Sequence, residues 1–467
     1  MKTQLIIIVC IIFFFPNAAS AFNEFFTFNT WLKNNGYDYR VGCELKEPKI
    51  NKYPFSICFS ETGEPLWKIK KNNLKVKKYK NQFSIPSREN PNRDTLIYYL
   101  YRYLFSHETN DKDSLQWDRY EISPSSNPYE FSSDLKNKSL VKEQLKTKAI
   151  LSYLFFENGK IIIDEISPDN RFGEFINKNT KLRSNSVGKT LVSYVFGHAI
   201  CEGYIESEDS KVNDWPLLEG TLYEDQKFIN FLNMTSGDQD YVYDSFIIDS
   251  NNSKNRRLTE LEIDTKDFWQ ISKIMKGLEG NVKKYNYNII NTNLLFNYVL
   301  IKTGKNFQDL LVSIFKDKVK IENSVYFFKP LQTPRSWGNA NSMFFASRYD
   351  YLRIAKAIMD DWQNDTCVGK YLKRIYKKRV SKGSVYVNEP DYNKTLSYGG
   401  QFHLDYPGLE DRIVLGMGGH GGQAILIDVE TSRIVVVNSI FYNKTKYKYN
   451  HKALLINPIK NGNFNIF

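Results

Sequence analysis

The chain has 467 residues, of which 42% are hydrophobic and 15% aromatic. This composition excludes an intrinsically disordered protein, and the length predicts two or three domains. The formal net charge is +12, and the densest basic run lies at residues 68–80. We interpret this run as an exposed strand edge or loop, with a binding patch for anionic polymers as the alternative.

The first residues are typical of an export signal. Lys2 precedes an unbroken apolar run at residues 5–15, and small residues at 19–21 form a cleavage site. The pattern predicts a signal peptide over 1–21 and a mature chain that begins near Phe22, secreted or periplasmic. The alternative is an uncleaved anchor. We expect no other membrane insertion and, after export, no nucleic-acid partner.

Residues 22–140 carry no recognisable chemistry, and we predict an N-terminal extension of unknown role. Residues 53–59 are strand-like, residues 94–105 form an amphipathic helical pattern, and the turn-rich residues 124–128 read as a linker. The remainder, 141–467, is predicted to be one unit with a mostly helical subdomain at about 205–370.

Five cysteines are present, and Cys10 leaves with the signal peptide. Export permits disulfides, and four remaining thiols allow three pairings. Cys43 and Cys58 are close in a strand-like region, and we favour a bridge between them. Cys201 lies in an apolar helical stretch and is interpreted as a buried small hydrophobic residue.

Hairpin patterns occur at both ends of the 141–467 unit. Strand-like runs at 149–156 and 160–165 flank an Asn-Gly turn, and runs at 424–428 and 434–439 form a second pair. Helical patterns lie between them at 187–200, 225–232, 292–301, 307–315 and 348–361. Strands at both ends with helices between them predict an α+β fold: an antiparallel sheet built from both termini and flanked by helices, plus an inserted helical domain.

The candidate catalytic residues lie in the segment SNSVGKTLVSYVFGHAICEG at residues 184–203. Ser186 and Lys189 are three positions apart at the start of a strongly apolar helix and therefore share a face. Burial should lower the pKa of the lysine amine, and a neutral amine can accept the serine proton. The helix N-terminus also favours negative charge developing at the serine.

Three further segments accompany this helix in order. They are FLNMTSG at 231–237, YNIINTNLL at 287–295 and MGGHGGQ at 417–423. Over residues 145–455 the chain resembles the serine β-lactamase and penicillin-binding-protein superfamily, whose signature begins with Ser-x-x-Lys. Within it, the chain is most similar to the nylon-oligomer hydrolases and their esterase relatives.

The resemblance implies a role for each matching residue. Tyr287 falls at the position of the family's catalytic tyrosine and would shuttle a proton to the leaving group. The backbone N–H groups of Ser186 and His420 would form the oxyanion hole, and Gly419 and Gly421 would let the substrate approach. Metal binding has little support, because the five histidines are scattered.

Two positions depart from the family pattern. Met417 stands where many relatives carry Lys or His, which argues against penicillins and D-alanyl peptides as good substrates. Ile289 replaces the polar residue two positions after the tyrosine. In the nylon-oligomer relatives, a tyrosine near the sequence position of Tyr241 and Tyr243 touches substrate. The alternative is that these two are solvated loop tyrosines.

We therefore expect a serine hydrolase that forms an acyl-enzyme from a small ester, amide or peptide-like substrate and needs no cofactor. Two alternatives remain open: a non-catalytic binding module on the same fold, and a cell-wall D-alanyl carboxypeptidase. The pattern does not predict the oligomeric state. Six Asn-x-Ser/Thr sequons are present, which matter only in a eukaryotic host.

Overall fold

The computed structural model describes residues 38–41, 56–59, 119–173, 176–243, 246–249, 256–258, 268–281, 284–328, 344–440 and 447–462. The chain divides into two compact units, one of residues 1–87 and 97–117 and the other of residues 88–96 and 118–467. The predicted signal peptide, Cys43, the basic run at 68–80 and the helical pattern at 94–105 lie outside the described residues. Of the first unit, the structure describes strand β1 (Asp38–Val41), paired in parallel with β2 (Ser56–Phe59).

A mixed nine-stranded sheet is the centre of the second unit. Its strand order is β13-β14-β15-β16-β17-β18-β5-β6-β4, antiparallel except for the β4–β6 pair. The strands are β13 (Val380–Ser381), β14 (Ser397–Gly399), β15 (Phe402–Leu404), β16 (Val414–Gly419), β17 (Gln423–Asp428), β18 (Arg433–Ser439), β5 (Ile150–Glu157), β6 (Lys160–Ile166) and β4 (Ser132–Ser133). The C-terminal strand β18 pairs along its length with the early strand β5, so the predicted sheet from both ends is confirmed.

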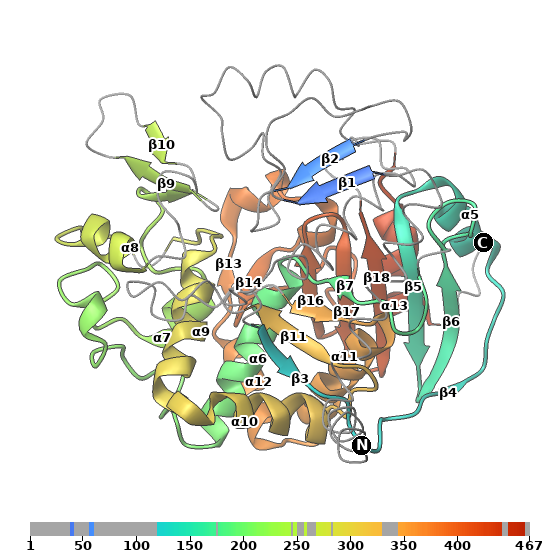
Figure 1. Cartoon of the computed structure of the whole chain (residues 1–467), viewed down its shortest axis with the longest axis horizontal. Coiled ribbons are helices and arrows are strands. Elements are labelled where there is room, and N and C mark those ends of the chain that lie inside the picture. Colours follow the sequence, from blue (N-terminus) through green and yellow to red (C-terminus); the bar gives the residue numbers. More distant parts are fainter. Residues whose placement is uncertain are drawn as a thin grey trace, which may run out of the picture. The chain divides into compact units, whose positions relative to one another are not determined.

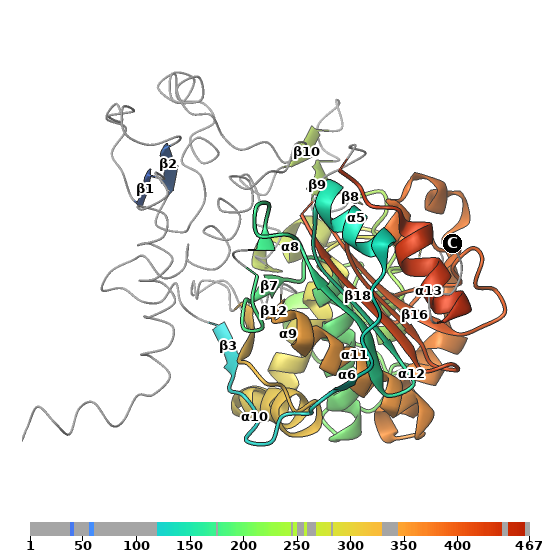
Figure 2. The same cartoon turned by 90° about the vertical axis from the view of Figure 1, so that its right-hand side faces the viewer.

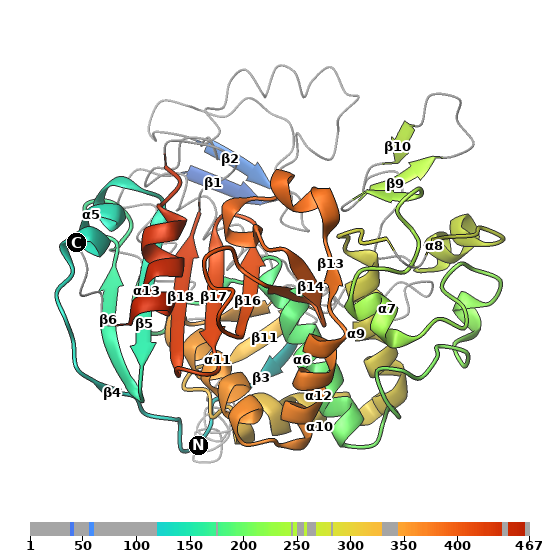
Figure 3. The same cartoon turned by 180° about the vertical axis from the view of Figure 1, so that it is seen from behind.

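Helices cover both faces of this sheet (Figures 1, 2 and 3). Helices α5 (Ser139–Thr147) and α13 (Asn457–Asn461) lie on one face, and α6 (Val187–Cys201) and α11 (Arg348–Gln363) lie on the other. Every residue of β5 and β17 is buried. A strand that is covered on both sides reads as a continuous apolar run, which explains the sequence of β5, ILSYLFFE.

Five further helices belong to the described part of the second unit. They are α7 (Phe228–Leu232), α8 (Phe268–Met275), α9 (Ile290–Thr303), α10 (Phe307–Val312) and α12 (Cys367–Lys377). Helices α9 and α12 both pack against α6, which is buried along nearly its whole length. The predicted helix at 307–315 ends at Val312 and continues as a π-type turn over Ser313–Lys318.

Two smaller sheets complete the second unit. One has the order β3-β11-β12-β7, with β3 (Arg119–Ile122), β11 (Val325–Phe328), β12 (Phe344–Ala346) and β7 (Leu182–Arg183). The other has the order β10-β9-β8, with β10 (Arg256–Leu258), β9 (Phe246–Asp249) and β8 (Val242–Tyr243). Because β3 and β4 belong to sheets of this unit, it includes residues 119–140, which we had predicted to be part of the extension.

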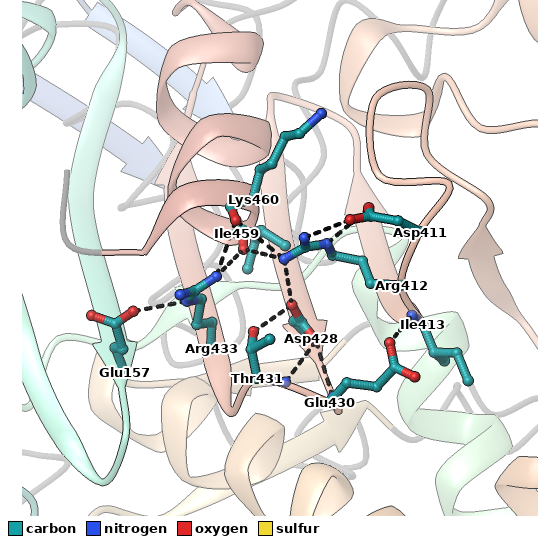
Figure 4. A network of polar contacts seen from close by, with 10 residues as sticks. All are labelled: Glu157, Asp411, Arg412, Ile413, Asp428, Glu430, Thr431, Arg433, Ile459 and Lys460. Carbon is teal, nitrogen blue, oxygen red and sulfur yellow. Dashed lines mark hydrogen bonds and ion pairs between the residues drawn. The ribbon is translucent and has the colours of Figure 1, made fainter. Parts of the chain in front are cut away.

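Two arginines hold the C-terminal helix to the sheet (Figure 4). Arg433 Nη1 donates to the carbonyl oxygens of Ile459 at 2.9 Å and Lys460 at 3.1 Å. Arg412 donates to the same two carbonyls at 3.1 and 3.2 Å. Cationic side chains satisfy the unpaired carbonyls of a helix C-terminus and complement its dipole. The nearly buried Glu157 accepts from Arg433 Nε at 2.8 Å and fixes its guanidinium.

Candidate active site

The turn before α6 places Ser186 at the start of the helix. Asn185 has a φ of 48°, in the left-handed region that favours Asn and Gly, so the chain reverses sharply after β7. The preceding Ser184 exchanges hydrogen bonds with β12: its Oγ accepts from Phe344 N–H, and its N–H donates to Phe344 O, both at 2.8 Å. Ser186 is therefore half-buried at the N-cap of a helix whose first turn is held from both sides.

Lys189 lies one turn after Ser186 on the same helix. Its N–H donates to the Ser186 carbonyl at 3.0 Å, and the residue is 5% exposed. Its Nζ lies 5.3 Å from the centroid of the Tyr287 ring, within cation–π range. The predicted burial of this lysine is confirmed, and the lowered pKa that we expect from the burial stays a prediction.

Tyr287 lies on the turn that enters α9. The half-buried ring packs against a small cluster of Met234, Tyr285 and Tyr398. It meets the Tyr398 ring edge to face at a centroid distance of 5.8 Å. These contacts hold the phenol beside Lys189, so the structure brings together two of the three side chains predicted to form the reaction centre, and the third, Ser186, lies one helical turn from the lysine.

The β16–β17 turn lies against the loop that carries Ser186. The carbonyl of His420 accepts a hydrogen bond from Asn185 Nδ2 at 2.5 Å. A Cβ atom at Gly419 would lie only 2.6 Å from the carbonyl oxygen of Ser184, so only glycine permits this approach. Gly421 has a φ of 90°, which also favours glycine. The predicted oxyanion loop is therefore adjacent to the helix start, with the His420 side chain exposed.

The two loop tyrosines predicted to touch substrate belong to the segment around β8, which contacts the Tyr287 turn through the hydrogen bond from Asn286 to Val242. The hydroxyl of Tyr241 donates to the carbonyl of Glu279 at 3.0 Å. Tyr243 pairs with Phe246 in the β8–β9 hairpin, where the structure describes its backbone alone.

A buried carboxyl that we did not single out as functional organises the turn around Tyr287. Asp238 is 0% exposed, and it accepts hydrogen bonds from the side chains of Asn286, Asn288 and Tyr223. Burial raises the pKa of Asp238, and the hydrogen bonds from these side chains oppose that rise. The sequence offered only the proximity of Asp238 to the Met-Thr-Ser-Gly segment as a signal.

A second buried polar cluster lies behind Tyr287. Lys382 pairs with Glu389 and donates to His403 Nδ1 at 3.1 Å, and the His403 ring centroid is 6.0 Å from that of Tyr287. Burial lowers the pKa of Lys382 to about 8 despite the charge of Glu389, and burial also lowers the pKa of His403. The neutral imidazole can therefore accept at Nδ1. No sequence pattern distinguished this lysine from the many others.

The two departures from the family pattern are both apolar in the structure. Met417 is fully buried within β16, where it pairs with Ile425. Ile289 is half-buried and forms the N-cap position of α9. Neither position supplies a cation or a hydrogen-bonding side chain to the site.

A disulfide joins Cys201, the last residue of α6, to Cys367, the first residue of α12. Our interpretation of Cys201 as an unpaired buried residue is therefore wrong. The error has a physical reason: the partners are 166 residues apart, and the proximity of two helix termini cannot be read from local patterns. The Cys43–Cys58 prediction stays open, because Cys43 lies outside the described residues.

Solved structures of other proteins share this fold, although no family model and no curated protein sequence matches the chain. A Bacillus anthracis protein assigned as a 6-aminohexanoate-dimer hydrolase is 13% identical with a TM-score of 0.53, over 73% of this chain and 89% of that one. A class C β-lactamase is 13% identical with a TM-score of 0.42, over 64% and 90% of the two chains. The hydrolase EstCE1 is 11% identical with a TM-score of 0.46, over 67% and 93%.

The predicted β-lactamase-like α+β fold is thereby confirmed, and the first of these likenesses carries that conclusion. In the described part of the chain, no helix is long and apolar enough to cross a membrane. The same residues contain no group of three or more His, Cys, Asp or Glu side chains placed to hold a metal ion.

Proposed function

We propose that the protein is a serine hydrolase that acts on a small ester or amide through an acyl-enzyme. The single observation that supports this most is the convergence of three segments on one helix start: the first turn of α6 with Ser186 and Lys189, the ring of Tyr287, and the loop of Gly419 and His420. Their order along the chain and their roles match a nucleophile, a base, a proton relay and an oxyanion loop.

The proposed reaction begins when neutral Lys189 accepts the proton of the Ser186 hydroxyl and the serine oxygen attacks the substrate carbonyl carbon. The negative charge on the carbonyl oxygen is stabilised by the backbone N–H groups of Ser186 and His420. Tyr287 delivers the proton to the leaving alkoxide or amine, and the bond to the leaving group breaks. A water molecule, deprotonated by Lys189 and Tyr287, then attacks the carbonyl carbon of the acyl-Ser186 ester. The acid product leaves, and the Ser186 oxygen regains its proton.

Met417 restricts the substrate class. A buried thioether at this position cannot pair with a substrate carboxylate, so neutral acyl groups fit this site better than penicillins or D-alanyl peptides. The carboxypeptidase alternative therefore predicts labelling by fluorescent penicillin, whereas the proposed esterase or amidase predicts none.

The disulfide supports export to an oxidising compartment, in agreement with the proposed signal peptide at residues 1–21. We propose that the mature protein is secreted or periplasmic. A fusion of residues 1–30 to a reporter enzyme, with the apolar run interrupted by arginine as the control, tests this part of the proposal.

The central test compares wild type with Ser186→Ala. Wild type should react with a fluorophosphonate probe and hydrolyse p-nitrophenyl butyrate, and Ser186→Ala should do neither. Ser132→Ala, which removes an exposed hydroxyl on β4, is the control for loss of a serine elsewhere and should keep its probe labelling at Ser186. If wild type and Ser186→Ala behave alike, the catalytic proposal is wrong, and the non-catalytic binding module becomes the better interpretation.

A further inference from the structure

Asp238 is a buried carboxyl. Its side chain is 0% exposed, and no lysine or arginine among the described residues forms an ion pair with it. Four neutral side chains donate to it: an amide N–H of Asn286 at 2.9 Å, of Asn288 at 3.0 Å, of Asn291 at 3.4 Å and the Tyr223 hydroxyl at 3.1 Å. Neutral donors offset the desolvation of a carboxyl less than an opposite charge would, so a carboxyl held by them is costly to bury.

Two of those donors flank the catalytic tyrosine. Asn286 and Asn288 lie immediately before and after Tyr287, and both donate to the same oxygen, Oδ1 of Asp238. The shared oxygen therefore holds the side-chain amides of Asn286 and Asn288 at a set distance from each other. A turn whose neighbouring residues are both bound to one buried group has little freedom to rotate the side chain between them.

The same network fixes the turn relative to α9. Asn288 Oδ1 accepts from the backbone N–H of Asn291 at 3.1 Å and from its side-chain amide at 3.1 Å, in the first turn of α9. Asn286 is held in addition by its N–H, which donates to Met234 O at 2.7 Å, and by its amide, which donates to Val242 O at 3.1 Å. The segment from the Met-Thr-Ser-Gly motif to α9 is thus tied together at Asp238.

We propose that Asp238 is a positioning residue for the reaction: by binding Asn286 and Asn288 on both sides of Tyr287, it holds the phenol against Lys189. The inference rests on the proposed function. It explains why the chain keeps a carboxyl buried among neutral donors at the start of this loop, and why the phenol meets the lysine although Tyr287 itself lies on a turn rather than within a helix or strand. If the cluster served stability alone, a neutral amide at position 238 would avoid the free-energy cost of burying a carboxyl.

The test uses the full-length protein and p-nitrophenyl butyrate. Asp238→Ala removes both carboxyl oxygens, so Asn286 and Asn288 lose the Oδ1 acceptor that they share. We expect kcat to fall at least tenfold while KM stays within about twofold, because the tyrosine acts in the transition state rather than in substrate binding. Tyr223→Phe is the matched control: it removes a donor from the same carboxyl but leaves both flanks of Tyr287 intact, and kcat should stay within twofold.

A swap of the two groups provides the rescue. In the double variant Asp238→Asn with Asn288→Asp, an amide and a carboxylate again face each other, and the new carboxylate can still accept from Asn291. This variant should recover most of the lost kcat, a result that a merely destabilised protein would not give. Circular dichroism and thermal unfolding of each variant establish that the comparison is between folded proteins.

The outcomes separate this inference from the proposed function. Asp238→Ala with wild-type kcat, or an equal loss of kcat in Asp238→Ala and Tyr223→Phe, overturns the inference while the inactivity of Ser186→Ala still supports the hydrolase. If wild type and Ser186→Ala are equally inactive, the proposed function fails first and the inference fails with it. If Asp238→Ala does not fold, Asn288→Ala replaces it, and wild-type kcat in that variant overturns the inference.

Discussion

Loss of the Cys201–Cys367 disulfide should be among the most destabilising changes available to this protein. The bond joins the end of α6 to the start of α12 and closes a loop of 166 residues. In the chain-entropy model, the stabilisation from such a cross-link grows with the logarithm of the loop length and reaches about 5 kcal/mol here at 25 °C. Since a domain is typically stable by about 5–15 kcal/mol, this is a large share of the total.

Urea unfolding followed by tryptophan fluorescence measures the effect. The double variant Cys201→Ala with Cys367→Ala should unfold at a clearly lower urea concentration than wild type purified from an oxidising compartment. Variants are preferable to a reducing agent, because Cys43 and Cys58 would also respond to reduction. The double variant Cys43→Ala with Cys58→Ala measures separately the loss of the other two cysteines of the mature chain.

The reasoning is refuted if the double variant and wild type unfold at the same urea concentration. It is also refuted if mass spectrometry of alkylated wild type finds Cys201 and Cys367 as free thiols. A folded double variant should retain its activity per folded molecule, because both sulfur atoms lie at the far end of α6 from Ser186.

Three further predictions concern other parts of the second unit. Asn185→Ala removes the amide that holds the His420 carbonyl and should lower kcat about tenfold with little change in KM, measured with p-nitrophenyl butyrate. His198 has a pKa lowered by burial from 6.5 to about 4, so the unfolded chain takes up a proton below pH 6.5 before the folded one does. Stability is therefore fully present above pH 6.5 and should fall by about 3 kcal/mol towards pH 4, and His198→Phe should flatten this dependence in urea titrations at several pH values. Arg433→Met should cost about 3 kcal/mol in urea unfolding because it removes the guanidinium that pairs with the buried Glu157, and adding Glu157→Gln should restore part of that loss.

Much of the fold could be predicted because its signals are local. The Asn-Gly turn between β5 and β6 is marked by a positive φ at both Asn158 and Gly159, as the dipeptide predicted. The buried helix α6 was predicted within one residue of its observed bounds, because an apolar run with a terminal glycine needs no tertiary context. The same holds for Ser186 and Lys189, which are fixed relative to each other by one helical turn.

What escaped prediction depends on contacts between distant segments. Asp238 and Asn288 are 50 residues apart, and nothing in either segment indicates that one binds the other. Lys382 becomes a buried cation only because Glu389 and His403 surround it. Short strands such as β7 and β14 have too few residues to show an alternation, and their pairing partners, rather than their sequences, define them.

The pairing of β18 with β5 has a consequence for biosynthesis. Leu154 and Val436 are register partners, so the middle of the sheet is completed only after residue 436 has left the ribosome. The strand that carries Gly419 is likewise made long after the helix that carries Lys189. A growing chain that has not reached these residues therefore lacks both the partner strand of β5 and the loop of Gly419 and His420.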